Sequence, residues 1–335
     1  MVSKKVMINR IWVGALIFLS FLGMVALNIY FPNYAYSPNP TQIISGRAIN
    51  SIIISALILL SVIEMRRALG KDKIPDCFSW LLWAYGFGLG LAYSLFGYTG
   101  ILFYTLLVFL GAVVTSLIHD RVDSLIYIAF MFVYPGLFMA TLLYLNRAAA
   151  SRTVTTDLMY PFMESDIWSF LTPDHAVGNL LPLNGIALAL VFAVSTFTDS
   201  FAFFVGVLFG KHQLCPNISP KKTIEGSIGG IVGGAFGSAL IYFLFDFFGI
   251  FGPQFGLTFD GLGLSTAHIV LTYVLIGLGG SVVTQIGDLI ASQVKRYCGI
   301  KDYSRILGEH GGIMDRFDGI MLNAVFVSFV FMFIF

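Results

Sequence analysis

A stretch of charged residues near the C-terminal end carries the chemistry that the sequence suggests. It covers residues 287–318 in a chain with only 11% charged and 57% hydrophobic residues. Asp288, Ser292 and the pair Lys295 and Arg296 follow one another at steps of four and three, so on a helix they share one face. We therefore expect one polar wall on this helix, with the carboxylate deeper and the two bases nearer to water.

A second acidic group follows a pair of glycines at the end of this stretch. The sequence there reads His310-Gly311-Gly312-Ile313-Met314-Asp315-Arg316-Phe317-Asp318. Paired glycines allow the backbone to turn and to approach a ligand closely. Asp315 falls near the start of a predicted helix, where a carboxylate is favoured. We therefore expect a second carboxylate to face Asp288.

Two carboxylates beside several cations are typical of a site for a divalent cation and a phosphorylated substrate. Hard oxygen ligands hold Mg²⁺, and Lys and Arg side chains bind phosphate oxygens. The basic residues of the stretch are Lys295, Arg296, Lys301, Arg305 and Arg316. We predict phosphoryl or nucleotidyl transfer. An ordinary basic loop on the inner side of a membrane would explain Lys301 or Arg305 equally well, but it would not explain the buried position expected for Asp288.

Membrane helices must hold these residues in place. The mean hydropathy is +0.86, and about 20 apolar residues suffice to cross a bilayer. Such windows fall near residues 11–30, 48–65, 78–97, 99–118, 124–145, 185–210, 226–249, 266–290 and 318–335. We predict an all-α polytopic integral membrane protein with about nine transmembrane helices. The weak turn at residues 97–100 separates the third window from the fourth.

The windows divide the chain into two membrane regions. Residues 1–183 are expected to form an N-terminal region of about five helices, ending in an outer segment, residues 146–184, that can include an interfacial helix. Residues 184–335 are expected to form the catalytic region, with about four helices and with cytoplasmic loops at 211–225 and 291–317.

The distribution of basic residues predicts the orientation. With the N-terminus inside, all but Arg47, Arg147 and Arg152 of the 19 Lys and Arg residues fall on the inner side. Because short cytoplasmic loops carry an excess of Lys and Arg, we expect the N-terminus in the cytoplasm and the C-terminus outside. The short segment before the first window favours a bacterial plasma membrane, with the active site facing the cytoplasm. The three cysteines are well separated and are expected to be free thiols.

The sixth predicted helix carries a second intramembrane acid. Asp199, followed by Ser200, lies about 11 residues before Gly210, which is roughly 16 Å deep at 1.5 Å per residue. An ionisable group at that depth is costly and by default marks a functional site. A structural hydrogen bond to another helix is the alternative.

The loop after this helix carries groups that suit a phosphate. Ser219, Lys221, Lys222 and Thr223 surround a proline, and Glu225 opens the next helix. Two cations and a hydroxyl at a helix N-terminus form an anion-binding arrangement. We expect this loop and the loop at 291–317 to face one mouth.

These motifs together resemble the signature of phosphatidate cytidylyltransferases, also called CDP-diacylglycerol synthases. The resemblance rests on Ser292–Arg296, Lys301–Asp302 and His310–Asp318, and upstream on Asp199, Ala202, Gly206, Gly210, Lys211 and Ser219–Gly226. Phe203 and Ile224 stand where the family usually has Tyr and Trp, and both are apolar or aromatic replacements at expected packing positions. Nearly all of the resemblance lies in the C-terminal half.

The resemblance implies a reaction in which CTP and phosphatidate give CDP-diacylglycerol and pyrophosphate. It also implies Mg²⁺ at Asp288 and Asp315, with catalytic roles for these two acids and for Lys295 and Arg296. The groups expected to bind the substrates are Asp199, Ser200, Ser219, Lys221, Lys222, Thr223, Glu225, Ser292, Lys301, Asp302, His310, Gly311, Gly312, Arg316 and Asp318. Asp199 and Ser200 could orient either the metal shell or the lipid phosphate, and His310 could contact a phosphate or cap the helix. A second, monovalent cation and a homodimer are left open, and no nucleic-acid partner is expected.

Two alternatives remain open at this point, one from another class of function and one that shares the chemistry. An ion-coupled transporter also uses intramembrane acids, but it would spread them across the bilayer, whereas here the charges gather at one face. A related lipid cytidylyltransferase of the CDP-archaeol type, or a lipid kinase, would share the charged residues. The lipid tails are recognised by apolar helix faces, so the motif does not distinguish among these lipid substrates.

Overall fold

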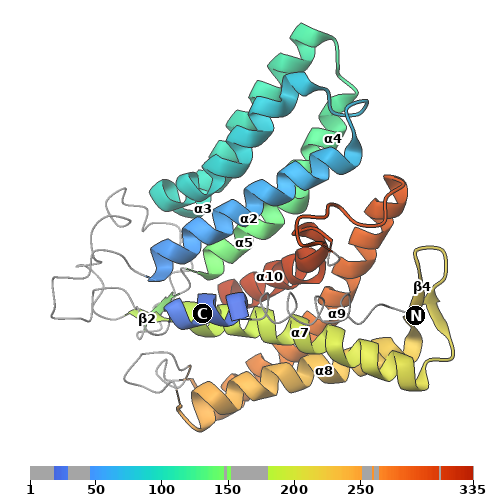
Figure 1. Cartoon of the computed structure of the whole chain (residues 1–335). Coiled ribbons are helices and arrows are strands. Elements are labelled where there is room, and N and C mark those ends of the chain that lie inside the picture. Colours follow the sequence, from blue (N-terminus) through green and yellow to red (C-terminus); the bar gives the residue numbers. More distant parts are fainter. Residues whose placement is uncertain are drawn as a thin grey trace.

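The computed structural model describes residues 19–28, 46–146, 149–151, 180–250, 259, 264–308 and 311–334. Within these ranges the chain is mainly helical, as Figure 1 shows. Six helical segments are long and apolar enough to cross a membrane: Thr99–His119, Ser124–Leu145, Asn184–Phe209, Ile224–Phe247, Thr266–Tyr297 and Met314–Ile334. These segments confirm a polytopic membrane protein. The number of nine spans and the orientation of the termini stay predictions.

Most of the N-terminal region forms the upper part of Figure 1, but its first described helix, Leu19–Asn28, lies lower, where Phe21 contacts Phe192 and Phe317 of the C-terminal region. The elements of the N-terminal region are a helix at Leu19–Asn28, α2 (Gly46–Leu69), a 3-10 turn (Asp76–Phe78), α3 (Ser79–His119), α4 (Ser124–Met131), a π-helical turn (Phe132–Leu137) and α5 (Phe138–Leu145). The break predicted at residues 97–100 is confirmed, because Gly97 has φ 61° and is not helical. The two arms of α3 then run side by side, and the Tyr104 hydroxyl donates to the Ala84 carbonyl at 2.7 Å.

The C-terminal region is built from four long helices. They are α7 (Asn184–Phe209), α8 (Ile224–Tyr242), which continues as a π-helical turn at Phe243–Phe247, α9 (Thr266–Tyr297) and α10 (Met314–Ile334). Glycines let α8 pack closely on α7, since a Cβ at Gly229 would meet Val205 and one at Gly237 would meet Ala193. Helix α10 packs against α9 and α7 on one side and against α5 on the other, so it joins the two regions.

Short antiparallel strand pairs complete the described elements. Strand β1 (Ala149–Ser151) pairs with β2 (Leu180–Pro182), which brings the ends of the predicted outer segment together. The interfacial helix predicted within that segment lies outside the described residues. Strands β3 (Gln213–Cys215) and β4 (Ser219–Thr223) form a hairpin where the sequence predicted a loop, with Gln213 opposite Thr223.

The loop predicted at residues 291–317 is shorter than expected. Helix α9 continues to Tyr297, and α10 begins at Met314. Lys295 and Arg296 lie in the last turn of α9, where cations interact favourably with the helix dipole. The helix therefore extends beyond the apolar window that predicted it. The expectation that Asp315 lies near a helix start is confirmed, because it belongs to the first turn of α10.

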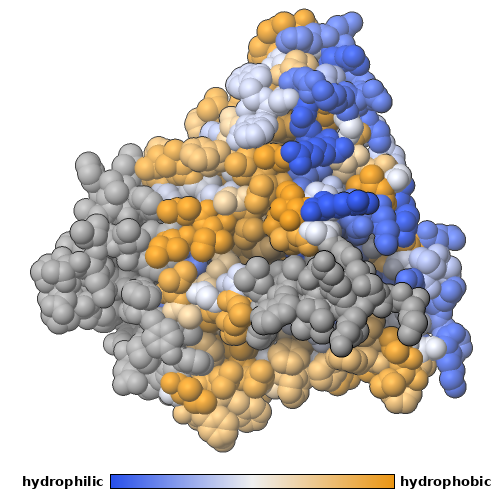
Figure 2. Space-filling view, viewed as in Figure 1, coloured by the Kyte–Doolittle hydropathy of each residue, from blue (hydrophilic) through white to orange (hydrophobic). Residues whose placement is uncertain are grey.

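Hydrophilic residues gather along one end of the molecule, at the right in Figure 2. Compared with Figure 1, this end carries the loop between α2 and α3, the β3–β4 hairpin and the loop between α9 and α10. Hydrophobic residues cover the flanks of the helices in this view. The polar loops of both regions therefore open on the same end.

Candidate active site

Acidic side chains from three helices meet near the polar end. Asp288 of α9 is 19% exposed, and its carboxylate accepts a hydrogen bond of 3.1 Å from Lys222 Nζ. Asp199 of α7 and Asp318 of α10 each lie close enough to Asp288 to interact electrostatically with it. The structure thus brings Asp199, Asp288 and Asp318 together beside Lys222, and we call these three aspartates the acidic cluster.

Two glycines allow the helices to approach at this point. A Cβ on Gly287 of α9 would meet the Asp318 carbonyl, and one on Gly319 of α10 would meet Thr284 and the Asp288 carboxylate. Only glycine permits this separation of the two backbones. The contact places Asp288 and Asp318 beside each other, although they are 30 positions apart in the sequence.

Basic side chains surround the acidic cluster. Lys222 and Arg316 act electrostatically on Asp199, and Lys295 acts on Asp318. Lys222 comes from β4, Lys295 from the last turn of α9 and Arg316 from the first turn of α10. Cations from three elements can therefore bind one anionic ligand beside the acidic cluster.

Asp315, the second predicted metal ligand, has a different environment. Its side chain is 4% exposed and accepts a hydrogen bond of 2.8 Å from Lys295 Nζ. Its other oxygen accepts hydrogen bonds of 2.9 Å from the amides of Tyr303 and Gly312. Asp315 therefore fastens the loop before α10, residues 298–313, to that helix. The metal role predicted for Asp315 stays a prediction.

Several residues predicted to bind substrate hold the hairpin together. Glu225 accepts hydrogen bonds from the amides of Lys211 at 3.0 Å and His212 at 3.2 Å, and its carboxylate lies 2.6 Å from the His212 ring. The Thr223 hydroxyl caps α8 by accepting a bond from Gly226 N. Arg296 Nε donates to the Ile218 carbonyl at 3.4 Å and so connects α9 to the hairpin.

The remaining predicted residues are spread around this site. Ser200 donates within its own helix to the Thr196 carbonyl, and Ser219 pairs with Cys215 in the hairpin. Ser292 is half-buried on α9, whereas Lys221, Lys301 and Asp302 are exposed. Gly311 has φ 82°, a conformation that glycine adopts readily. His310 lies outside the described residues.

Two residues of the N-terminal region reach the site and were not predicted. Glu64 of α2 is fully buried and accepts hydrogen bonds from Ser304, Ile313 and Met314 in the loop before α10. Tyr134 is 4% exposed and interacts electrostatically with Asp318 and Asp288. An acid inside an apolar helix was a signal for Glu64. No local pattern identified Tyr134.

The loop before α10 is anchored by a buried tyrosine. Tyr303 is 5% exposed, and its hydroxyl donates to the Ala291 carbonyl at 3.3 Å. Burial raises the pKa of Tyr303, so the hydroxyl keeps its proton at neutral pH.

The predicted free thiols are confirmed for Cys77, Cys215 and Cys298, and burial raises the pKa of the Cys298 thiol.

The donor set suits a magnesium ion that also binds substrate. Among the residues that the structure describes, no three His, Cys, Asp or Glu side chains form a group that could enclose a metal ion. Mg²⁺ at phosphate-transfer sites is usually held by one or two carboxylates together with substrate phosphates. The carboxylates that face one another at Asp288 fit this requirement.

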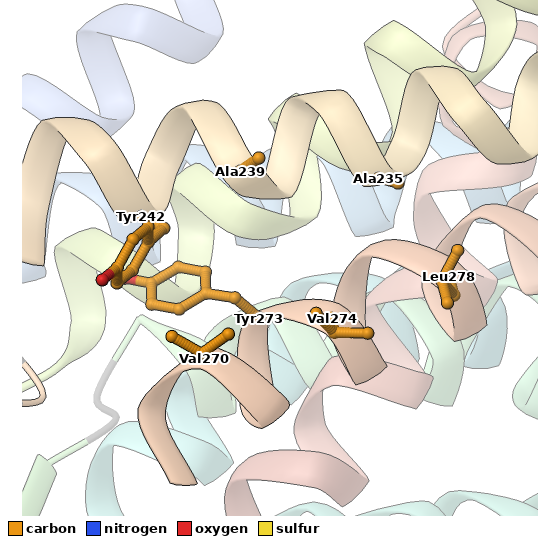
Figure 3. A pocket seen from close by; sticks show the side chains of 7 residues that line it. All are labelled: Ala235, Ala239, Tyr242, Val270, Tyr273, Val274 and Leu278. Atoms are coloured by element: carbon orange, nitrogen blue, oxygen red, sulfur yellow. The ribbon is translucent and has the colours of Figure 1, made fainter. Parts of the chain in front are cut away.

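An apolar cavity of about 210 Å³ lies elsewhere, between α8 and α9. Figure 3 shows its seven lining residues, among them Tyr242, Tyr273 and Leu278. Leu278 precedes Asp288 by ten residues, which is about 15 Å along a helix. The lining includes no charged side chain, so this cavity is separate from the charged site.

Comparison with known proteins gives a family and several relatives. The model of the cytidylyltransferase family matches residues 40–335. The chain is 39% identical over 130 residues to a phosphatidate cytidylyltransferase of Staphylococcus haemolyticus, covering 39% of this chain and 43% of the relative. It is 38% identical over 126 residues to that of Aquifex aeolicus, covering 38% and 39%. It is 39% identical over 169 residues to that of Mycobacterium tuberculosis H37Rv, covering 48% and 43%. The chain therefore spans less than half the length of these relatives.

Proposed function

Because the chain belongs to the cytidylyltransferase family, we propose that it transfers the cytidylyl group of CTP to phosphatidate. The products are CDP-diacylglycerol and pyrophosphate, and the pathway served is phospholipid synthesis. The relatives named phosphatidate cytidylyltransferase support this substrate pair. The observation that carries the proposal is the Lys222–Asp288 pair, with Asp199 and Asp318 facing it from two further helices.

The reaction is a substitution at the α-phosphorus of CTP. An oxygen of the phosphatidate phosphate forms the new bond to this phosphorus, and the bond to the oxygen that bridges it to the β-phosphate breaks. Pyrophosphate leaves with the electron pair of that bond. A phosphate monoester has a second pKa near ~6, so most of it is already dianionic at neutral pH. The nucleophile therefore requires no dedicated general base, and catalysis depends on position and charge.

The basic residues stabilise the charge that develops on the leaving group. Lys222 and Arg316 come from different elements and both act on Asp199, so they can approach phosphate oxygens from two sides. Lys295 is paired with Asp315 and holds that acid while it acts on Asp318. Arg296 is exposed and connects to the hairpin through the Ile218 carbonyl.

A Mg²⁺ ion bound at this site would supply positive charge to the phosphate oxygens of CTP. Asp288 would hold it, together with an aspartate from the first turns of α10. The sequence pattern favours Asp315 as this partner. Asp318 is favoured by its proximity to Asp288 and by the three hydrogen bonds that already occupy Asp315.

The location of the site suits substrates from two phases. CTP is soluble and reaches the polar end of the molecule from water. Phosphatidate stays in the leaflet, so its head group would reach the site from between the helices below that end. The loops at this hydrophilic end carry Lys and Arg residues, which supports a cytoplasmic position for the site, in a bacterial plasma membrane.

Purified protein in detergent tests the substrates directly. Nucleotide (CTP, ATP or GTP), lipid (phosphatidate, an archaeol-type ether lipid phosphate or diacylglycerol) and Mg²⁺ are varied one at a time, and pyrophosphate and the lipid product are measured. We expect pyrophosphate and a cytidylylated lipid only with CTP, phosphatidate and Mg²⁺ together. Turnover with the ether lipid alone would reject phosphatidate, and phosphorylation of diacylglycerol would replace the transferase by a kinase.

A further inference from the structure

The loop before α10 is fastened by two carboxylates that come from different regions of the chain. At its first end, the Tyr303 amide donates to Asp315 and the Ser304 hydroxyl donates to Glu64, at 2.9 and 2.5 Å. At its second end, the Gly312 amide donates to Asp315 at 2.9 Å. The two ends of the loop therefore meet at the same pair of acids.

Glu64 also holds the start of α10. Its two oxygens accept hydrogen bonds of 3.0 and 2.8 Å from the amides of Ile313 and Met314. These amides belong to the N-terminal end of a helix, where the partial positive charge favours a carboxylate. A phosphate cannot use them while Glu64 is in place. Glu64 therefore acts on the position of α10 and not on the substrate.

The geometry around Glu64 leaves little freedom. Its side chain is fully buried, and a Cβ on Gly312 would meet both of its carboxylate oxygens. The contact joins residues that are 240 to 250 positions apart in the sequence. Asp315 and Asp318 follow directly in α10, so a shift of the helix start would move both acids relative to Asp288 and Lys295.

We propose that Glu64 is a positioning residue for the proposed transferase reaction. Its carboxylate binds Ser304 at one end of the loop and the amides of Ile313 and Met314 at the other. It thereby fixes the position of the start of α10 relative to α9. The N-terminal region then does more than span the membrane, because one of its side chains fixes the geometry of the site. This inference rests on the proposed function only for its effect on turnover, since the effect on the loop is independent of any substrate.

Two variants and one matched control test this role in the full-length protein. Glu64→Gln keeps the volume but turns amide hydrogens toward backbone donors. Ser304→Ala removes the hydrogen bond to Glu64 and also the one that the Ser304 hydroxyl accepts from the Ile306 amide. Ser61→Ala is the control, because Ser61 is fully buried on the same helix as Glu64 and its hydroxyl donates to the Leu57 carbonyl of that helix. All variants are first compared with wild type by gel filtration and thermal midpoint.

Hydrogen exchange gives the readout that needs no activity. We expect Glu64→Gln to speed exchange in the peptide 304–314 by about tenfold or more, because a hydrogen bond to a charged group contributes at least a factor of about ten. Exchange in the peptide 224–232, at the start of α8, should stay unchanged. Wild-type exchange of the loop in folded Glu64→Gln would overturn the proposal, whether or not the protein proves to be a transferase.

Turnover gives the second readout. We expect kcat of pyrophosphate release to fall about tenfold or more in Glu64→Gln, while KM for CTP changes by less than about threefold, because Glu64 faces backbone groups and not the nucleotide. Ser304→Ala should lower kcat in the wild-type background and have a smaller effect beside Glu64→Gln, because the contact between Ser304 and Glu64 is then already lost and only the bond from the Ile306 amide remains to be removed. Additive effects, or an equal loss in Ser61→Ala, would reject the positioning role. If wild type is inactive with every lipid and nucleotide, the proposed function fails. The exchange result still decides whether Glu64 holds the loop in place.

Discussion

At the scale of residues, the sequence identified the charged groups but not the partner of each one. Asp288 and Asp199 were recognisable because an ionisable residue inside an apolar helix requires a reason. Asp315 and Asp318 lie three positions apart at the start of one helix, so both point to nearly the same side and the spacing does not separate their roles. Their tertiary contacts distinguish the two roles, because Asp315 holds the loop before α10 while Asp318 faces Asp288. Glu64 carried the same signal of an acid in an apolar helix, but its role was missed because its partners lie 240 to 250 positions away in the chain.

The two aspartates of α10 should therefore respond differently to substitution. Asp315→Asn is expected to lower the stability by about 3 kcal/mol, because it leaves the largely buried Lys295 without its carboxylate partner. Asp318→Asn is expected to leave the thermal midpoint near that of wild type and to raise the Mg²⁺ concentration needed for half-maximal activity. Thermal unfolding in detergent and a Mg²⁺ titration of activity measure the two effects. An unchanged Mg²⁺ requirement in Asp318→Asn, with a raised one in a stable Asp315→Asn, would assign the metal to Asp315 instead.

At the scale of elements, hydropathy located most of the helices and missed what lies between them. An apolar window ends where polar residues begin, whereas a helix can continue through polar residues. Helix α9 therefore extends beyond its window to Tyr297. The β3–β4 hairpin was missed because strands of three and five residues carry too little alternation to be recognised. The break at Gly97 was predicted because glycine permits the positive φ that a reversal requires.

The close contact between α9 and α10 should be sensitive to a single methyl group. Gly319→Ala is expected to lower stability by about 1–3 kcal/mol and turnover about tenfold, because the new Cβ meets Thr284 and the Asp288 carboxylate. Gly23→Ala is the matched control, since a Cβ at Gly23 has no neighbour within 4 Å. Thermal unfolding and pyrophosphate release measure both. Equal behaviour of the two variants would mean that the glycine contact does not set the site.

At the scale of the whole molecule, the polar loops of both regions lie at one end. The positive-inside rule predicts that this end faces the cytoplasm.

Labelling from one side of the membrane measures the orientation. In a background with Cys77, Cys215 and Cys298 replaced by serine, Lys301→Cys places one thiol on the exposed loop between α9 and α10. We expect a membrane-impermeant maleimide to label it in inside-out vesicles and in permeabilised cells, but not in intact cells. Labelling of intact cells would place the loop, and with it the site, on the outer side.

The measurement that most directly tests the central claim compares two intramembrane aspartates. Asp288 belongs to the acidic cluster, whereas Asp246 lies in the turn after α8 and accepts a hydrogen bond of 2.5 Å from Tyr273. Pyrophosphate release from CTP and phosphatidate is measured for wild type, Asp288→Asn and Asp246→Asn at equal amounts of folded protein. We predict a loss of at least about 10²-fold in Asp288→Asn and less than about threefold in Asp246→Asn. Near wild-type turnover in folded Asp288→Asn would contradict the assignment of the active site.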